Sequence, residues 1–462
     1  MSLLNLLNIG KSAIFASQAA IGVASHNIAN VNTPGYTRQE AILRTATPIV
    51  PVPGGYLGMG VNVSSIERRY DRFITGQLLG QEQSYGKSSV MDQVLGQVEQ
   101  VFNDTGGAGL SDSLNAFFNA WRTLSATPED TAKRAVLISD ANALVSTMKQ
   151  MESGMLGTIK EMNGEIADVA GRVNSIATDI ARLNAQIVQI ESGGGGAKAN
   201  DLRDARDGLV TELSGLAEIG TLEDKYGSLT VTLGMRNLVE RETVNRLTTS
   251  PDAAGGIRLS LDGVDVTSRI TRGRLGGLFA SREAVASGPL ADLRHLAAAL
   301  TNEMNLLHRA GVGLDGSTGN DFFTPLSPPL TDADAISNLG VAVSDPRKIA
   351  AASAASALPG DNTNALRIAG LAEASVASLG NATFSGYYGG IVADVGKLAR
   401  NASDLNRFDG NLRSELQNRR ESASGVSLDE EAMNLIAFQR AYEAGAKIIQ
   451  ITDELLQTVL QL

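Results

Sequence analysis

The chain has 462 residues, with 50 acidic and 39 basic side chains, a formal net charge of −11 and no cysteine. This charge argues against a nucleic-acid partner, since such binding relies on clustered Lys and Arg to displace counterions from phosphate. The absence of cysteine excludes disulfides, thiolate metal sites and a cysteine nucleophile, but it leaves the compartment open.

Aromatic residues make up only 4% of the chain, which disfavours large hydrophobic cores and favours thin, elongated helical packing. The N-terminus lacks the basic start, apolar core and cleavage site of a secretory signal. No uninterrupted apolar run reaches the length of about 18 residues that a membrane-spanning helix needs. We therefore expect no membrane partner and no conventional export signal.

The first predicted element is a helix whose seam residues recur at alternating spacings of three and four, the pattern of a coiled coil. The seam consists of Leu6, Ile9, Ala13, Ala16, Ala20, Val23, Asn27 and Asn30. Small seam residues bury little area each, at about 25 cal/mol per Å² removed from water. This helix cannot offset its ordering entropy alone, so it requires a partner.

Turn chemistry ends this helix. The stretch SHNIANVNTPGYTRQE, residues 25–40, combines several Asn side chains with a Pro-Gly pair. We expect the chain to leave the helix here and to continue as an extended segment from near Arg38.

Two long helical patterns follow, over residues 70–125 and 131–191, interrupted by NDTGGAG and SATPED. In the second interruption, Thr127 is the predicted N-cap, followed by a first-position proline and an acidic first turn. The run SGGGGAK from Ser192 predicts a flexible turn between helices.

The segment DLRDARDG spaces three aspartates by three residues, but arginines lie between them. This pattern predicts a solvated, charge-laced helix start rather than a metal site. Alternation then changes to period two in GSLTVTLG and GIRLSLDGVDV, which predicts short strands of a hairpin-rich insertion. A helix from about Pro289 to Arg309 and a loop from Ala310 to Asp345 come next, and the helical pattern then returns.

The last predicted helix has the strongest periodicity in the chain. Its apolar residues recur every seventh position at Leu428, Leu435, Tyr442, Ile449 and Leu456, with Phe438 and Val459 on the intervening seam. Ser427 is its predicted N-cap, with acids in the first turn. Periodicity leaves two interpretations open: the terminal helices pair with each other, parallel or antiparallel, or each packs in an ordinary bundle.

The predicted fold is mainly α: an elongated multi-domain protein with terminal coiled-coil helices and a central long-helix bundle carrying a small β-rich inserted domain. The predicted domains are residues 1–66 with 426–462 as the terminal helices, 67–220 with 272–425 as the central mainly helical domain, and 221–271 as the small β-rich insertion. Whether residues 310–345 join that insertion stays open.

No active site stands out in the sequence. The three histidines, His26, His295 and His308, are too scattered for most metal or acid-base clusters. DGSTGND, from Asp315 to Asp321, lacks the spacing and the closing Glu of a calcium loop. We expect no enzymatic activity, no metal and no cofactor.

The segment ASHNIANVNTPGYTRQE resembles the N-terminal signature of the flagellar rod, hook and hook-associated proteins. The matching residues are Ser25, Asn27, Ile28, Ala29, Asn30, Asn32, Thr33, Pro34, Gly35 and Tyr36. Four further segments resemble the hook-associated members of the hook–filament junction: the C-terminal SGVSLDEEAMNLIAFQRAYEAGAKIIQITDELLQTVL, ANDLRDARDGLVTEL, DPRKIAAAS and YYGGIVADVG. The resemblance covers essentially the whole chain.

The resemblance implies a structural adaptor of the bacterial flagellum that polymerises between hook and filament, joins them mechanically and templates filament assembly. The implied partners are copies of itself in a ring, hook protein on one side, a second junction protein and the filament on the other, and an export chaperone at the C-terminal helix. The implied location is extracellular, after export as an unfolded chain through the flagellar type III apparatus.

The resemblance implies an axial protein whose terminal segments, residues 1–66 and 426–462, order only on polymerisation and form an inner-tube domain, with residues 221–271 as the outer insertion. Asn27, Asn30 and Asn32 are expected to satisfy backbone groups at the helix end, Pro34 and Gly35 to set the turn, and Tyr36 to offer an apolar face with a polar tip at a subunit contact. Because the strand-like part is short, we expect one small outer domain.

The alternative function is that of another flagellar axial subunit, from the distal rod or the hook. A secreted hydrolase is a more distant alternative.

Overall fold

The computed structural model describes residues 3–47, 51–52, 55–56, 58–103, 109–193, 197–252, 255–326 and 332–461. The prediction of a mainly helical chain with long terminal helices and a small antiparallel β region is confirmed. The chain divides into two compact units. The first unit is Met1–Gly86, Asp168–Leu275 and Phe408–Leu462, and the second is Lys87–Ala167 and Gly276–Arg407.

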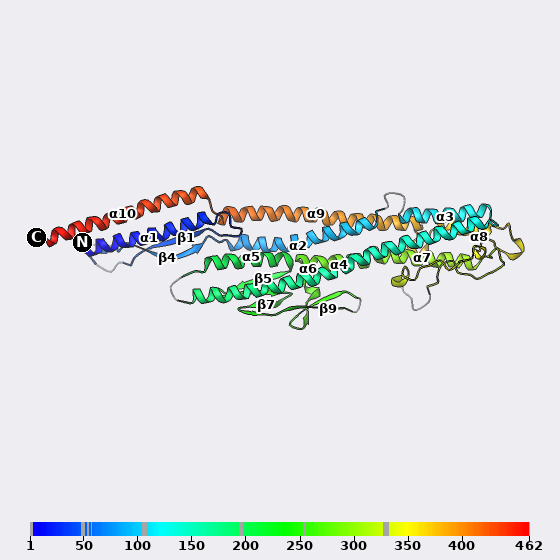
Figure 1. Cartoon of the computed structure of the whole chain (residues 1–462), viewed down its shortest axis with the longest axis horizontal. Helices are drawn as coiled ribbons and strands as arrows, with labels where there is room; N and C mark the ends of the chain where they lie inside the picture. The colour runs from blue at the N-terminus through cyan, green and yellow to red at the C-terminus, as the bar shows by residue number, and fades with distance from the viewer. Residues whose placement is uncertain are drawn as a thin grey trace. The chain divides into compact units, whose positions relative to one another are not determined.

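The described helices and strands follow one another along the chain as Figure 1 labels them. The α-helices are α1 (Leu3–Ala29), α2 (Arg72–Val101), α3 (Leu110–Ala126), α4 (Thr131–Glu191), α5 (Asn200–Leu216), α6 (Gly273–Ser287), α7 (Pro289–Arg309), α8 (Thr363–Ala369), α9 (Phe384–Ser424) and α10 (Leu428–Leu460). The strands are β1 (Gln39–Thr45), β2 (Pro51–Val52), β3 (Gly55–Tyr56), β4 (Val61–Arg68), β5 (Ile219–Glu223), β6 (Leu229–Leu233), β7 (Arg236–Glu240), β8 (Thr243–Val244), β9 (Leu247–Pro251), β10 (Ile257–Leu261) and β11 (Val264–Asp265).

The helix predicted over Pro289–Arg309 and the extended segment predicted from near Arg38 are confirmed by α7 and β1. The predicted N-cap at Thr127 is wrong: Thr127 ends α3, and Asp130 caps α4 by accepting bonds from the amides of Ala132 (2.8 Å) and Lys133 (3.3 Å). A carboxylate directly before the first turn reaches these amides more easily than a residue four positions upstream. The turns predicted at NDTGGAG and SGGGGAK include residues 104–108 and 194–196, which lie outside the described residues.

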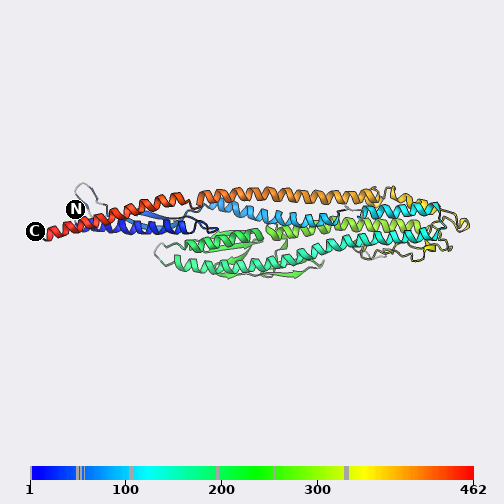
Figure 2. The same cartoon turned by 45° about the horizontal axis from the view of Figure 1, so that its top comes forward.

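In the first unit, α1 and α10 lie side by side and antiparallel in both Figure 1 and Figure 2. Gly10 near the start of α1 meets Gly445 near the middle of α10. A Cβ atom at Gly10 would lie 2.9 Å from Ile449 Cγ1, and one at Gly445 would lie 3.3 Å from the Gly10 carbonyl oxygen. The two backbones approach closely only because both positions are glycine. The terminal helices therefore pair with each other within the chain.

An antiparallel hairpin of β1 and β4 packs beside α1, with register from Gln39↔Arg68 to Thr45↔Val61. Its contact with α1 is polar as well as apolar, since Ser12 Oγ accepts a bond from the Val61 amide (3.2 Å). The hairpin thus holds the chain that leaves α1 against the helix itself.

Two antiparallel sheets, in the orders β5-β6-β7-β8 and β11-β10-β9, fold against the last part of α4. The predicted strands are confirmed, and β6 alternates buried and half-buried residues along its length. Asn174 of α4 bonds both the amide and the carbonyl of Leu247, and Asn184 does the same for Leu229. The hairpin between β10 and β11 turns at Asp262-Gly263, where both residues have positive φ.

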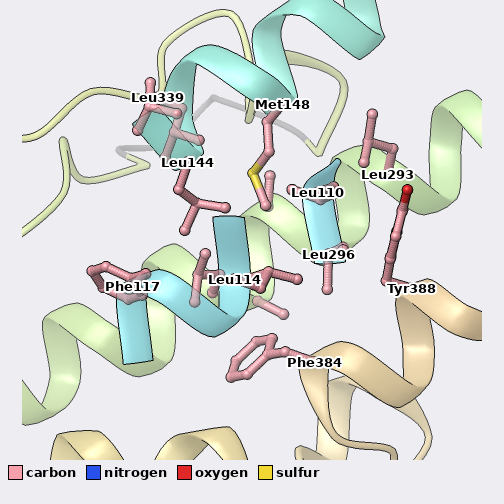
Figure 3. Close-up of a cluster of buried hydrophobic side chains, with 14 of the residues drawn as sticks. Leu110, Leu114, Phe117, Leu144, Met148, Leu293, Leu296, Leu339, Phe384 and Tyr388 are labelled. Carbon is pink, nitrogen blue, oxygen red and sulfur yellow. The ribbon is translucent and has the colours of Figure 1, made fainter. Parts of the chain in front are cut away.

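The second unit buries one continuous apolar cluster from α3, α4, α7, α9 and the loops after α7 (Figure 3). This is a larger core than the low aromatic content indicated, because the aromatic residues concentrate here. Trp121, the one tryptophan, is fully buried and packs on Phe322, which also packs on Phe117. Side chains of α7 order the following loop: Asn305 Oδ1 accepts bonds from the amides of Phe322 and Phe323, each at 2.9 Å.

We expect Leu296→Ala to lower the free energy of unfolding by about 2–5 kcal/mol, because Leu296 is fully buried in this cluster. Leu306→Ala on the same helix is the matched control and should change stability by less than about 0.5 kcal/mol, since Leu306 is 64% exposed. Urea unfolding followed by the fluorescence of Trp121 measures both variants. Equal destabilisation by the two would contradict this account of the core.

Candidate functional site

The interface between α1 and α10 has an unusual composition on the α10 side. The residues most buried there are Glu431, Gly445 and Thr452, which share a heptad position with the half-buried Phe438. Of the predicted seam, Leu435, Ile449 and Leu456 are half-buried, whereas Leu428 and Tyr442 are exposed. Leu428 and Tyr442 therefore lie outside the contact with α1, which follows a neighbouring stripe of small and polar residues, and their role in an assembly interface stays a prediction.

The α1 side agrees better with the predicted seam. Ala16, Ala20 and Asn27 are buried, and the other seam residues, Leu6, Ile9, Ala13, Val23 and Asn30, are half-buried. The sequence pattern missed Gly10, Ser17 and Ala24, which are buried as well. The close backbone approach at Gly10 explains why residues without large side chains form this interface.

Asn27 joins three segments at the end of α1. Its amide nitrogen donates to the Gln39 carbonyl (2.8 Å) and to Glu431 Oε2 (3.2 Å). Its amide oxygen accepts from Tyr36 Oη (2.7 Å) and from the Gln39 amide (3.0 Å). The side chain is 1% exposed. These four bonds use both donors and both acceptor positions of the buried amide. We call Asn27, Tyr36, Arg38, Gln39 and Glu431 the polar joint.

Arg38 connects the polar joint to the start of α10. Its guanidinium donates to Glu430 Oε2 (2.6 Å), and its Nε lies 2.7 Å from Glu431 Oε1. The Arg38 amide donates to the carbonyl of Ser424 at the end of α9 (2.9 Å). Ser427 Oγ accepts a long bond from the Glu430 amide (3.5 Å), which confirms the predicted N-cap of α10.

The turn between α1 and β1 has the predicted chemistry. Asn30 Nδ2 donates to the His26 carbonyl (3.0 Å), which satisfies the helix end, and the Tyr36 amide donates to the Thr33 carbonyl (3.1 Å) across Pro34 and Gly35. Gly35 has φ +81°, as the third position of a type II turn requires.

The predicted roles of the remaining turn residues differ from one another. Asn32 and Pro34 are exposed. The hydroxyl of Tyr36, predicted as the polar tip of a subunit contact, bonds Asn27 within the chain. Burial, followed by the charges of Asp201, Asp204 and Glu431, raises the pKa of Tyr36, so the phenol keeps its proton.

The start of α5 completes the site. Asp204 accepts from the Thr37 amide (2.9 Å) and from Arg68 (2.6 Å), and Arg68 also bonds Asp207 (2.8 Å). Asp201 accepts from the side chain of Gln39 (2.7 Å). The prediction of a solvated helix start is wrong: Asp204 is buried, and these acids bind the chain that leaves α1.

The arginines of the same segment bind the strand region. Arg203 makes two bonds to Glu191, at 2.7 and 2.9 Å, and one to Glu223 (2.6 Å), while buried Arg206 donates to Asn184 and to the Gly227 carbonyl. Burial alone would raise the pKa of Glu191, but bonds from Arg203 and the Ala199 amide lower it from 4.5 to about 2. Opposite sides of α5 thus hold the terminal region and the sheets.

The described residues contain no group of three or more His, Asp or Glu side chains placed to hold a metal ion. His308 is buried; its Nδ1 donates to the Asn320 carbonyl (2.7 Å), and its Nε2 accepts from the Ala350 amide (3.0 Å). Burial lowers the pKa of His308, whereas the bond to Asp332 raises that of His295. Both histidines hold loops.

The pair of terminal helices leaves many apolar side chains exposed. They are Leu4 and Phe15 on α1, and Leu428, Met433, Ile436, Tyr442, Ile451, Leu455, Val459 and Leu460 on α10. Within the described ranges, α1 is the one helix long and apolar enough to cross a membrane by length and composition. A helix in the core of a protein passes the same test, and the Ala-rich side of α1 packs on α10.

Three family models match the chain. The model described as "Flagellar hook-associated protein FlgK helical domain" matches residues 95–323, "Flagellar basal body rod FlgEFG protein C-terminal" matches 417–462, and "Flagella basal body rod protein" matches 7–37. The last two matches contain most of α10 and α1, including the polar joint apart from Arg38 and Gln39.

Full-length relatives share the order of these segments. Flagellar hook-associated protein 1 of Escherichia coli (strain K12) is 28% identical and covers 99% of this chain and 100% of its own length. The protein of that name from Bacillus subtilis (strain 168) is 28% identical, with 98% and 97% covered. The solved structure of the flagellar hook junction protein FlgK from Burkholderia pseudomallei has TM-score 0.65 and 17% identity over 76% of this chain and 100% of its own, which supports the fold.

The helical pair, the turn signature and these matches define an axial protein of the bacterial flagellum. Within that class, the chain belongs to the family of flagellar hook-associated protein 1, a family of structural flagellar proteins.

We expect Asn27→Asp to destabilise the polar joint by about 2–4 kcal/mol, because a carboxylate would face Glu431 and the donors to Gln39 and Glu431 would be lost. Amide exchange over β1 and the first turns of α10, measured on free and on hook-assembled chains, checks this. Asn32→Asp is the control, since Asn32 is exposed. Unchanged protection in Asn27→Asp would refute the role of the joint.

Glu191 should stabilise the first unit in a defined pH window. Because its pKa falls from 4.5 to about 2 on folding, its contribution is complete above pH 4.5 and is lost as the pH falls through 2. We expect Glu191→Gln to lower the free energy of unfolding by about 1–2 kcal/mol at pH 7. This difference from the parent chain should vanish near pH 2. Urea titrations between pH 7 and pH 2 measure this stability difference. Glu242→Gln is the control, since Glu242 is exposed. A difference independent of pH would contradict it.

Proposed function

We propose that the chain polymerises as a short ring between hook and filament, joins the two mechanically and templates filament assembly. The observation that carries this proposal is the antiparallel pair of α1 and α10, which approach closely along small and polar residues while many large apolar side chains point outward. Exposed apolar area of this kind favours burial against further helices, at about 25 cal/mol per Å². Copies of the same chain supply such helices in a ring.

The partners follow from this position in the flagellum. Hook protein would contact the ring on one side, and a second junction protein and the filament would contact it on the other. We propose further that the terminal helices, residues 1–66 with 426–462, form an inner tube on assembly, with 67–220 and 272–425 as the central layer and 221–271 outermost.

Export as an unfolded chain through the flagellar type III apparatus fits a sequence without cysteine, since no disulfide must form or break in transit. An export chaperone would cover the outward apolar side of α10, where Ile451, Leu455 and Val459 are exposed. The functional location is then extracellular, at the hook–filament junction.

A different axial subunit, from the distal rod or the hook, is the competing assignment, since two of the three family models are named for rod proteins. The match to the hook-associated helical domain over residues 95–323 favours the junction. Enzymatic activity forms no part of the proposal: the described residues offer no metal cluster, and His295 and His308 bind loops. A secreted hydrolase would need an acid-base pair in a cleft.

Ala20→Glu should abolish incorporation into hook–filament junctions, because Ala20 is 2% exposed in the helical pair and a buried unpaired carboxylate costs several kcal/mol. Leu456→Glu should act in the same way from α10. Gln18→Glu, exposed on α1, is the control. Immunoblots of purified hook–filament complexes measure incorporation, and the buried environment of Trp121 reports that the second unit stays folded. Normal junctions built from Ala20→Glu would refute the tube-wall role.

Amide exchange on the free chain and on hook-assembled chains tests the timing of this assembly. Protection of residues 1–66 and 426–462 only after assembly supports polymerisation-coupled ordering. Full protection already in the free chain would mean that another surface drives polymerisation.

A further inference from the structure

A cationic aromatic patch lies in the first unit where β4 leads into α2. It consists of Arg69, Tyr70, Arg72 and Phe73, which line a hollow of about 520 Å³ together with Asp71 and Ala423. Phe73 is 74% exposed, the most exposed aromatic ring among the described residues. Exposed aromatic rings flanked by arginines are typical of the centres of protein interfaces.

The local fold holds this patch in place without using its charges. Asp71 Oδ1 accepts from the amides of Phe73 (2.8 Å) and Ile74 (3.1 Å), so its carboxylate caps α2. Neither Arg69 nor Arg72 forms an ion pair with any carboxylate in the described part of the chain. Packing within the chain therefore does not account for the side chains of Arg72 and Phe73.

A second patch of opposite charge lies on the first turns of α10. Met433 and Ile436 are exposed on the side of α10 that faces away from Glu431 and Phe438, and Leu428 is exposed at the start of the helix. Asp429 lies between them and is exposed. This turn has three acids, Asp429, Glu430 and Glu431; in the described chain Arg38 pairs with the last two, and Asp429 forms no ion pair there. The turn can therefore accept a second arginine.

Arg38 shows that the two patches lie at one level of the first unit. The Arg69 amide donates to the Arg38 carbonyl (2.8 Å), and the Arg38 side chain pairs with Glu430 and Glu431. Copies in a ring are related mainly by rotation about the ring axis, which keeps each residue at its own level. Patches at one level are those that neighbouring copies can bring together.

We propose that Arg69–Phe73 of one copy docks on the Leu428–Ile436 face of the next copy, with Phe73 packed beside Met433 and Arg72 paired with Asp429. This inference rests on the proposed ring and identifies its lateral contact. A second copy is the occupant because each patch supplies what the other lacks in charge and in apolar area, and because the acidic turn already binds one arginine in this way.

Cross-linking between single-cysteine chains tests the contact, since the natural sequence contains no cysteine. Phe73→Cys and Met433→Cys are co-expressed as separate chains, and purified hook–filament complexes are treated with a short thiol-specific cross-linker. We expect a covalent dimer only when both variants are present. Phe73→Cys with Met235→Cys, exposed in the strand region, is the control pair.

Incorporated Phe73→Cys and Met433→Cys chains that give no dimer, or that cross-link only to a different protein, would overturn the lateral contact while leaving the junction role intact. Absence of the parent chain from junctions would instead overturn the proposed function. If the cysteine variants are not incorporated, charge exchange decides: Arg72→Glu and Asp429→Arg each reduce incorporation about tenfold, and the double variant restores it to within about twofold. A double variant no better than either single one also overturns the contact.

Discussion

The buried amide of Asn27 is the contact on which the terminal region depends. One side chain holds the end of α1, the backbone of β1 at Gln39 and the carboxylate of Glu431 on α10. A buried amide with all its partners stabilises one arrangement strongly, because any other arrangement leaves donors or acceptors without partners. The direction in which the chain leaves α1 and the axial register of α1 against α10 are therefore fixed by the same residue.

Small residues set the distance between the two terminal helices whose register Asn27 fixes. The approach of Gly10 and Gly445 brings two backbones together, but it buries little apolar area for each residue ordered. Hydrogen bonds and ion pairs at the polar joint determine the geometry of this pair, and the outward apolar side chains of α10 retain their capacity to bind. Such a pair is accurate in shape and modest in stability, which is the combination that subunit-dependent ordering requires.

Periodicity predicted the elements well, since it depends on local spacing: the small seam of α1, the alternation in β6 and the capping of α10 all follow from residues within one element. The failures involve partners distant in sequence. Asp204 binds the Thr37 amide from 167 positions away, and nothing local distinguishes it from a solvated helix aspartate. The heptad pattern on α10 predicted that its large residues form the seam. Glu431 and Gly445 are buried instead, because Asn27 and Gly10 face them.

The two units differ in what holds them together, and this difference bears on assembly. The second unit has a continuous apolar core around Trp121 and Phe322, which provides stability before any partner is present. The first unit depends more on directional contacts, in which α5 binds the chain leaving α1 through Asp204 and the sheets through Arg203. Since charged and amide contacts are strong only when every partner is in place, ordering of the terminal helices and ordering of this network reinforce each other. In the proposed assembly, such a subunit keeps its second unit folded while its terminal helices become ordered at the growing structure.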